Sequence, residues 1–139
     1  MKWSINNKFT YPKSTRSIYN GSRHYLVDGE RLPSVTNIIS MTKKTEEKEA
    51  LEKWKRENKD SEIILKESSN RGTLMHGYLS EMLMGKMNGE LIEEVNLPKK
   101  MAETIISHGL NDYVKEVYAS EECVYSLKYK YAGTMDALI

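Results

Sequence analysis

Residues 121–139 read EECVYSLKYKYAGTMDALI, and here the hydrophobic pattern changes from helical spacing to a period of two. Cys123, Tyr125 and Leu127 alternate along one side, a turn follows near residues 128–130, and a second extended run covers residues 132–139. Alternation at a period of two is typical of strands. The stretch therefore predicts two strands joined by a turn, at the end of a chain whose middle is helical.

The segment upstream carries hydrophobic residues at helical spacing. The expected helices cover residues 35–41, 45–57, 62–84 and 98–118. Ser34 is placed to cap the first, and Pro98 suits the first turn of the last. We expect the long helix to be interrupted near Ser68-Ser69-Asn70 and to end at Gly85.

The first forty residues contain two turn dipeptides, Asn20-Gly21 and Asp28-Gly29, on either side of the run Ser22 to Val27. Both dipeptides accept positive φ in two-residue hairpin turns. They predict a small antiparallel hairpin or meander. Together with the helices and the final strands, this gives an α/β fold class: an N-terminal β-hairpin, about three substantial helices and the first strands of a mixed sheet. We find no internal repeat and expect one domain over residues 1–139.

Composition excludes several classes of protein. The chain has 139 residues, of which 39% are hydrophobic and 29% charged, the balance of an ordinary globular protein. No apolar run approaches the roughly 18 residues needed to cross a bilayer, so we expect no membrane partner and a cytoplasmic location. The single cysteine, Cys123, excludes an internal disulfide and a thiolate zinc site. A net charge of +1 gives no global positive field for nucleic acid, so any such contact must be local.

Two residues stand out as chemical candidates. Asp136 lies within the run Gly133-Thr134-Met135-Asp136-Ala137-Leu138-Ile139, where a buried carboxylate needs a metal ion, a cation or several donors. The alternative is that its face of the strand is exposed. His76 falls at the edge of the apolar stripe of its helix, where its side chain can reach a cleft between helix and sheet. The alternative is a hydrogen-bonded packing histidine.

Two motifs occur in order along the chain, Arg-Gly-Thr-x-x-His at residues 71–76 and Gly-Thr-x-Asp at residues 133–136. This ordered pair resembles the motifs of the PD-(D/E)XK nuclease superfamily, specifically its RecB-like and phage exonuclease branch. Residues 29–36 and 51–55 are also similar to the leading segment of phage-type exonucleases and of the mitochondrial genome maintenance exonuclease. The resemblance covers about residues 23–139. It implies a restriction-endonuclease-like sheet, of which this chain holds the N-terminal part.

The resemblance implies that His76 and Asp136 are the catalytic metal ligands of a DNA exonuclease. The ion would be Mg²⁺ or Mn²⁺, which suits mixed nitrogen and oxygen ligation. In that family the next strand supplies an acidic residue and a lysine two positions later, and this sequence has no such pair after Asp136. We therefore expect a nuclease domain cut before that strand, whose own active site is incomplete. Glu81 follows His76 by five residues, about 140° round the helix, and is expected to be a surface charge.

Candidate DNA contacts lie near these motifs. Arg71 and Thr73 are expected to bind phosphate near the helix that carries His76, and Ser34 and Thr36 are weaker candidates with a simple capping role as the alternative. Trp54 either stacks on a base or anchors its helix.

The leading hypothesis is a metal-dependent exonuclease acting on DNA, single-stranded or at an end, in replication, recombination or turnover in a bacterial or phage-infected cell. The first alternative is a catalytically inactive nucleic-acid or protein interaction module of the same fold. A purely structural helical protein is a second alternative, which leaves the strand of Asp136 without a role.

Overall fold

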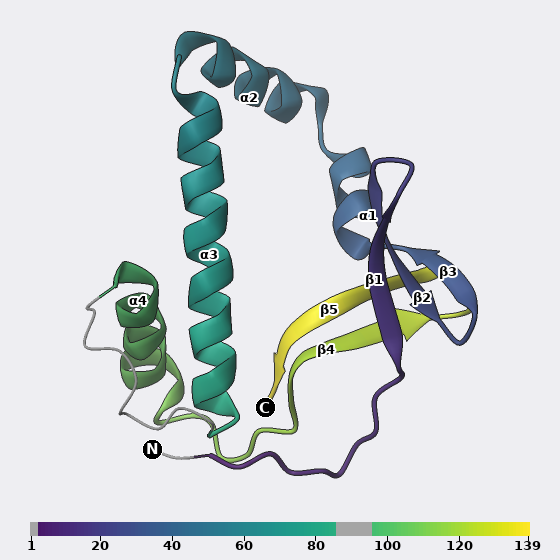
Figure 1. The fold of residues 1–139 in the computed structure, drawn as a ribbon, viewed down its shortest axis with the longest axis vertical. Coiled ribbons are helices and arrows are strands. Elements are labelled where there is room, and N and C mark those ends of the chain that lie inside the picture. The colour runs from purple at the N-terminus through teal and green to yellow at the C-terminus, as the bar shows by residue number, and fades with distance from the viewer. Residues whose placement is uncertain (1–2, 86–95) are drawn as a thin grey trace. The chain divides into compact units, whose positions relative to one another are not determined.

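The structure is a computed structural model that describes residues 3–85 and 96–139 (Figure 1). Its class is mixed α/β, as the sequence predicts. The strands form two small antiparallel sheets. In chain order the elements are β1 (Ser14–Tyr19), β2 (Ser22–Val27), β3 (Glu30–Pro33), α1 (Val35–Thr42), α2 (Thr45–Glu57), α3 (Ser61–Leu83), α4 (Leu97–Ile105), the π-helical turn η1 (Ile106–Leu110), β4 (Ala119–Ser126) and β5 (Tyr131–Leu138). None of the helices described is long and apolar enough to cross a bilayer.

The chain forms two compact units. The helical unit contains residues 3–9, 60–85, 96–121 and 136–139, and the sheet unit contains residues 10–59 and 122–135. Strands β4 and β5 pair with each other, and each contributes residues to both units. The expectation of a single nuclease domain with a restriction-endonuclease-like sheet stays a prediction.

The sheet unit begins with the antiparallel sheet β1-β2-β3. Its two turns fall at the predicted dipeptides, where Asn20 and Gly21 have φ of 50° and 73° and Asp28 and Gly29 have φ of 49° and 78°. Positive φ at both central residues matches the right-handed twist of the flanking strands, which explains why these dipeptides set the register. The predicted meander is confirmed.

One face of this sheet builds the core of the sheet unit. The buried residues come from β2, β3 and the unit's parts of β4 and β5: Tyr25, Val27, Leu32, Cys123 and Ala132. The Tyr25 hydroxyl lies 2.9 Å from the Thr134 hydroxyl, which satisfies the polar tip of a buried ring.

Helices α1 and α2 follow the sheet with the bounds that the sequence predicts to within one residue. Ser34 is buried and caps α1, because its Oγ accepts a hydrogen bond from the Asn37 backbone N–H at 3.1 Å. In α2, acidic residues occupy the first turn and basic residues the last, which is favourable for the helix dipole.

Helix α3 runs unbroken from Ser61 to Leu83, so the expected interruption at residues 68–70 is wrong. Serine and asparagine lower helix stability by only several tenths of a kcal/mol each relative to alanine, which is too little to end a helix with good formers on both sides. Thr73 also donates to the Ser69 carbonyl at 3.0 Å, a bond that threonine forms inside a helix. Gly85, with φ of 66°, follows the helix as predicted.

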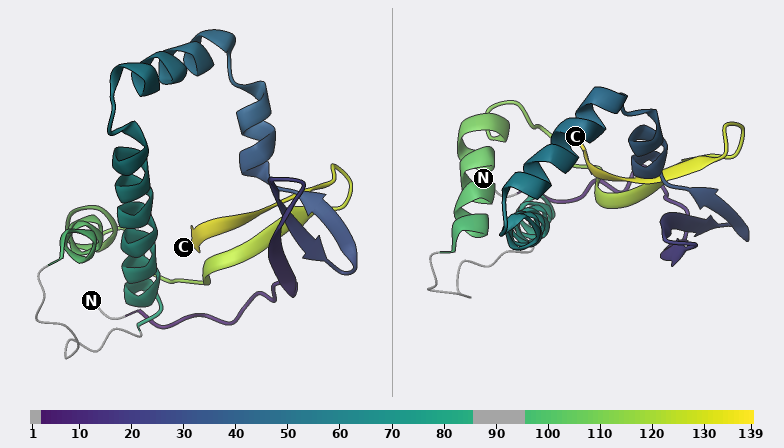
Figure 2. Two further views of the ribbon diagram at one scale, coloured as in Figure 1. Left: turned by 45° about the horizontal axis from the view of Figure 1, so that its top comes forward. Right: turned by 90° about the horizontal axis from the view of Figure 1, so that it is seen from above.

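Helix α4 lies beside the C-terminal half of α3 in both views of Figure 2. The predicted helix to Tyr118 is too long, because helical geometry stops at Leu110, after the π-turn η1. Val117 instead forms a parallel β-bridge with Ile5. Its β-branched side chain is fully buried and suits extended backbone, so tertiary packing decides this segment.

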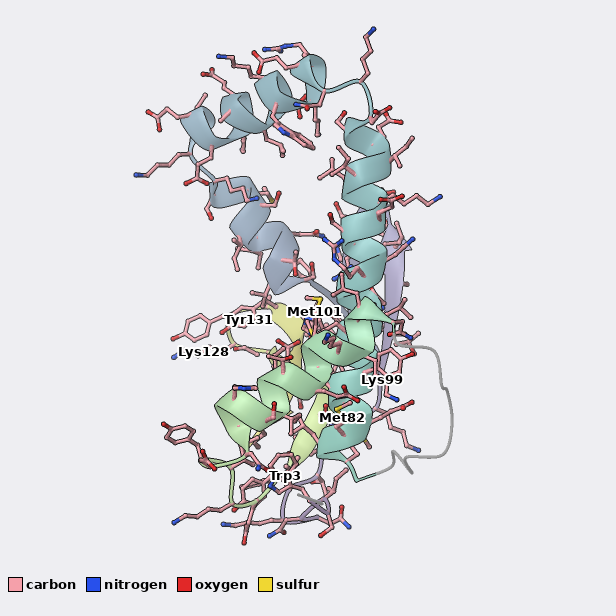
Figure 3. The ribbon with its side chains drawn as sticks, turned by 90° about the vertical axis from the view of Figure 1, so that its left-hand side faces the viewer. Trp3, Met82, Lys99, Met101, Lys128 and Tyr131 are labelled. Carbon is pink, nitrogen blue, oxygen red and sulfur yellow. The ribbon has the colours of Figure 1, made fainter. Side chains whose placement is uncertain are left out.

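The core of the helical unit forms around Trp3, Leu83, Val114 and Val117. Figure 3 shows Trp3 beside the C-terminal end of α3. Its Nε1–H donates to the Val114 carbonyl at 3.2 Å, so the ring is buried without leaving its polar atom unsatisfied. The N-terminal segment is thereby packed against the end of α3.

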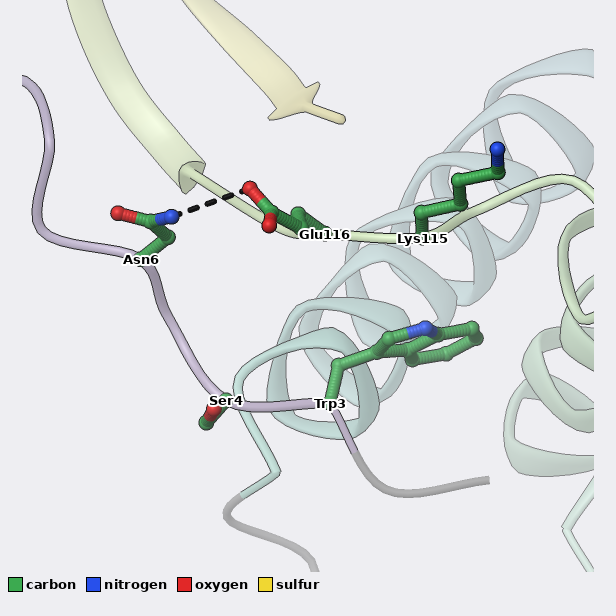
Figure 4. Close-up of a pocket in the computed structure, with 5 residues that line it drawn as sticks. All are labelled: Trp3, Ser4, Asn6, Lys115 and Glu116. Carbon is green, nitrogen blue, oxygen red and sulfur yellow. Dashed lines mark hydrogen bonds between the residues drawn. The ribbon is translucent and has the colours of Figure 1, made fainter.

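A surface hollow next to Trp3 contains a small hydrogen-bond network (Figure 4). Glu116 Oε2 accepts from the Tyr118 hydroxyl at 2.6 Å and from Asn6 Nδ2 at 3.0 Å. The hydrogen bond from Tyr118, and to a smaller extent that from Asn6, lowers the pKa of Glu116 below its usual 4.5. The same hydrogen bond to Glu116 raises the pKa of the Tyr118 hydroxyl above its usual 10.0. The network joins the N-terminal segment to the chain before β4.

We expect Glu116→Gln to lower stability only where the carboxylate is ionised. A lowered native pKa adds stability above pH 4.5, and this contribution is lost as the pH falls through the lowered value. Urea unfolding of wild type and variant should therefore differ near neutral pH and converge in acid. The control is Glu103→Gln on the exposed side of α4, and a Glu116→Gln difference that persists unchanged in acid would contradict the ionic origin.

Candidate metal centre

Three side chains from three elements of the helical unit converge. His76 comes from α3, Glu121 from β4 and Asp136 from β5. His76 Nδ1 lies 3.2 Å from Asp136 Oδ1 and 3.7 Å from Glu121 Oε1. Each of the three residues offers one nitrogen or oxygen atom as a ligand, and these three atoms all lie within 4.8 Å of one another. The structure thus brings the two predicted residues, His76 and Asp136, together and adds a third.

A buried serine, Ser120 of β4, connects the three elements that carry the group. The Ser120 hydroxyl lies 2.9 Å from the Ser80 hydroxyl and 2.9 Å from the backbone carbonyl oxygen of Asp136. Ser80 is one helical turn after His76, and Ser120 immediately precedes Glu121. One partner of the Ser120 hydroxyl is therefore the backbone of Asp136, and the other, Ser80, lies one helical turn from His76.

Glu121 reaches the group through an irregularity in β4. Its φ is 57°, in the left-handed region that costs a non-glycine residue about 1–2 kcal/mol. The two residues before it, Ala119 and Ser120, are both buried although they are consecutive, so the alternation of the strand is interrupted here. Such a bulge re-aims a side chain, and in this strand it leaves Glu121 beside His76.

Asp136 differs from the sequence-based expectation in one respect. The favoured interpretation required a buried carboxylate, but the Asp136 side chain is 70% exposed. Its strand is less covered than its apolar sequence suggests, since Leu138 and Ile139 are exposed as well. The support for Asp136 as a ligand is therefore its proximity to His76 and not a desolvation argument.

The donor set fits a hard divalent cation. The ligands of an octahedral ion at about 2.1 Å are separated by about 3.0 Å when adjacent and about 4.2 Å when opposite. The separations of 3.2 and 3.7 Å from the imidazole to the carboxylates lie at or between these values. The side chains of His76 and Glu121 are each 43% exposed, so the site is open to solvent on one side. Three protein ligands with an open side leave room for water and substrate oxygens.

The other predicted residues have different surroundings. Arg71 is exposed on α3 with a long 3.5 Å contact to the Ser68 hydroxyl, and Thr73 lies on α3 three residues before His76. Both are in the middle of a continuous helix, α3, and not at a helix start where backbone N–H groups are free to bind phosphate. Ser34 and Thr36 belong to the sheet unit, where Ser34 is buried and capping and Thr36 is exposed. Their contact with DNA stays a prediction.

Glu121 is the residue that sequence reasoning missed. Periodicity placed it only at the start of a strand, and a regular strand gives no reason to single it out. The signal in the sequence is weak: two adjacent glutamates, Glu121 and Glu122, lie in a strand that pairs with the strand of Asp136. Only the irregular backbone of β4 at Glu121 explains why this glutamate, and not its neighbour Glu122, is part of the group. Glu81 is exposed, as predicted for a surface charge.

Comparison with protein-family models, with curated proteins and with solved structures finds no match for this chain. The geometry of His76, Glu121 and Asp136 is the observation that bears most directly on function.

Proposed function

We propose that this chain carries the metal site of a divalent-metal-dependent DNA exonuclease of the PD-(D/E)XK type. The observation that carries the proposal is the group His76, Glu121 and Asp136, with one ligand atom from each within 4.8 Å of the others. Two of its members are the residues that the motif resemblance selects. Mg²⁺ and Mn²⁺ are the proposed ions, because one imidazole and two carboxylates provide the mixed ligation that they accept.

Each residue has a distinct role in this proposal. Asp136 and Glu121 supply negative charge and oxygen ligands from adjacent strands, while His76 Nδ1 supplies the nitrogen ligand from α3. A bound divalent ion would polarise a phosphodiester and lower the pKa of the attacking water. Ser120 is a positioning residue, because its hydroxyl contacts the Ser80 hydroxyl and the Asp136 backbone carbonyl.

The substrate approaches from the exposed side of this group. Thr73 lies three residues before His76 on α3. The two residues are therefore about 60° apart round the helix and roughly 4.5 Å apart along its axis, which places Thr73 one helical turn from a proposed metal ligand. Its hydroxyl already donates to the Ser69 carbonyl and offers an acceptor atom to a substrate or water. Arg71 is exposed and supplies the nearest positive charge in the sequence before His76, which favours a phosphate group at this end of the site.

The decisive experiment is hydrolysis of end-labelled linear DNA, with Mn²⁺ or Mg²⁺ as the only divalent ion, by a protein in which this chain is followed by a strand that carries the acidic-x-Lys pair. We expect metal-dependent release of nucleotides from an end, and loss of at least about 100-fold in rate for His76→Ala. The Glu81→Gln variant removes a carboxylate from another face of α3 and should keep the wild-type rate. Hydrolysis that persists unchanged in His76→Ala would overturn the assignment.

The inactive interaction module of the same fold is the second candidate. A protein that binds Mn²⁺ through the three residues but releases no nucleotide from linear DNA, even with the acidic-x-Lys strand present, would favour this candidate and overturn the exonuclease.

A further inference from the structure

We infer that the solvent-facing side of the sheet β1-β2-β3 binds single-stranded nucleic acid by stacking on Tyr19 and Arg31. The register of the sheet defines this outer sheet face, because residues opposite one another on neighbouring strands share a side. Its members are Thr15, Ser17, Tyr19, Ser22, His24, Leu26, Arg31 and Pro33. Tyr25, Val27 and Leu32 are on the opposite side and form the core of the sheet unit.

Two planar groups on the outer sheet face contact the ring of Tyr19. The Arg31 guanidinium lies over the Tyr19 ring, 3.9 Å from its centroid, and the His24 ring meets Tyr19 edge to face at 5.7 Å. His24 Nδ1 donates to the Ser22 carbonyl at 3.0 Å, which fixes the orientation of the imidazole. The guanidinium is therefore positioned over the Tyr19 ring before any ligand arrives.

Arg31 is held by the ring and not by a carboxylate. Within the part of the chain that the structure describes, no ion pair to Arg31 is found. None of the eight residues of the outer sheet face is acidic, and two of them, Arg31 and His24, are basic. An exposed guanidinium whose donors face no carboxylate offers its fork to a phosphate and its plane to a base.

The chemistry of the face points to a single strand. Tyr19 and Leu26 are 45% and 46% exposed and supply apolar contact area beside the stacked arginine. Bases in a single strand present their faces for stacking on aromatic rings and guanidinium planes, whereas a duplex hides those faces. The hydroxyls of Thr15, Ser17 and Ser22 add hydrogen-bonding groups that tolerate any sequence. We therefore expect binding with little preference for sequence and a clear preference for a single strand.

The inference concerns binding only and does not require the metal centre, so the two are tested separately. The probe is fluorescein-labelled oligothymidylate of about 20 nucleotides, titrated with the full chain in EDTA and followed by fluorescence anisotropy. Tyr19→Ala should weaken binding by about 5- to 150-fold, the range for removing a stacking aromatic side chain. Arg31→Ala should weaken it comparably and reduce the slope of log affinity against log salt by about 0.7.

Matched variants separate stacking from charge and from misfolding. Tyr19→Phe keeps the ring and should bind as wild type does. Arg23→Ala removes the same charge from the opposite side of β2 and should change affinity by no more than about twofold. Circular dichroism melting of each variant reports whether the sheet is intact. Binding unchanged in a folded Tyr19→Ala variant, absence of binding by wild type, or equal affinity for a duplex of the same length would each overturn the inference.

Discussion

Asp136→Asn is expected to abolish tight binding of Mn²⁺ by this chain. The substitution keeps the size of the side chain but removes a negative charge and replaces a carboxylate oxygen 3.2 Å from His76 Nδ1 with a neutral amide. Altering even an outer-shell partner of a metal ligand costs about 10- to 100-fold in affinity, so the loss of a ligand itself should exceed that range. Electron paramagnetic resonance of free Mn²⁺ measures the dissociation constant directly.

The other members of the group test whether it acts as a unit. Glu121→Gln and His76→Ala should each weaken Mn²⁺ binding to a similar degree, whereas Glu81→Gln should not. The uncomplexed Asp136→Asn variant should unfold within about 0.5 kcal/mol of wild type, because the carboxylate is largely exposed. Wild-type affinity for Mn²⁺ in Asp136→Asn would show that the three residues are an ion pair network and not a metal centre.

Gly85→Ala is expected to destabilise the helical unit by about 2–4 kcal/mol, because it combines backbone strain with a steric overlap. Gly85 has φ of 66°, and an added Cβ would lie 2.3 Å from the backbone oxygen of Trp3. The overlap is with backbone, so it cannot be relieved by a side-chain rotation. The Trp3 segment would have to move, with loss of the bond from its Nε1–H to Val114.

Gly72→Ala is the matched control within the same helix. Gly72 has helical backbone, and a Cβ there would meet nothing within 4 Å. Alanine in place of glycine in a helix interior stabilises by about 0.5–1 kcal/mol. Urea unfolding should therefore shift in opposite directions for the two variants. A Gly85→Ala variant as stable as wild type would show that the Trp3 segment is not held at this position.

Much of the local structure could be predicted because short-range chemistry decides it. Asn20-Gly21 and Asp28-Gly29 accept the positive φ that their turns need, and Ser34 caps α1 through its own side chain. The bounds of α2 follow from strong helix formers with charges placed along the helix dipole. The turns and the cap depend on residues within one turn of one another, and the bounds of α2 depend on the residues of that helix alone.

The misses have the opposite character. The serines and asparagine of residues 68–70 are weak helix formers, yet α3 continues because good helix formers extend on both sides. Residues 114–118 fit helical spacing as well as extended backbone, and the burial of Val114 and Val117 with Trp3 selects the extended form. Asp136 was expected in a core-facing position, but the covering of its strand depends on elements far from it in the sequence.

The turns, the Ser34 cap of α1, the mixed α/β class and the choice of His76 and Asp136 as candidates could all be read from the sequence. Only the tertiary structure brought those two side chains to 3.2 Å and added Glu121. The physical reason is that the meeting point of α3, β4 and β5 depends on packing between segments separated by 45 to 60 residues, and on one left-handed residue in β4. No periodicity in the chain encodes where such a bulge turns a side chain.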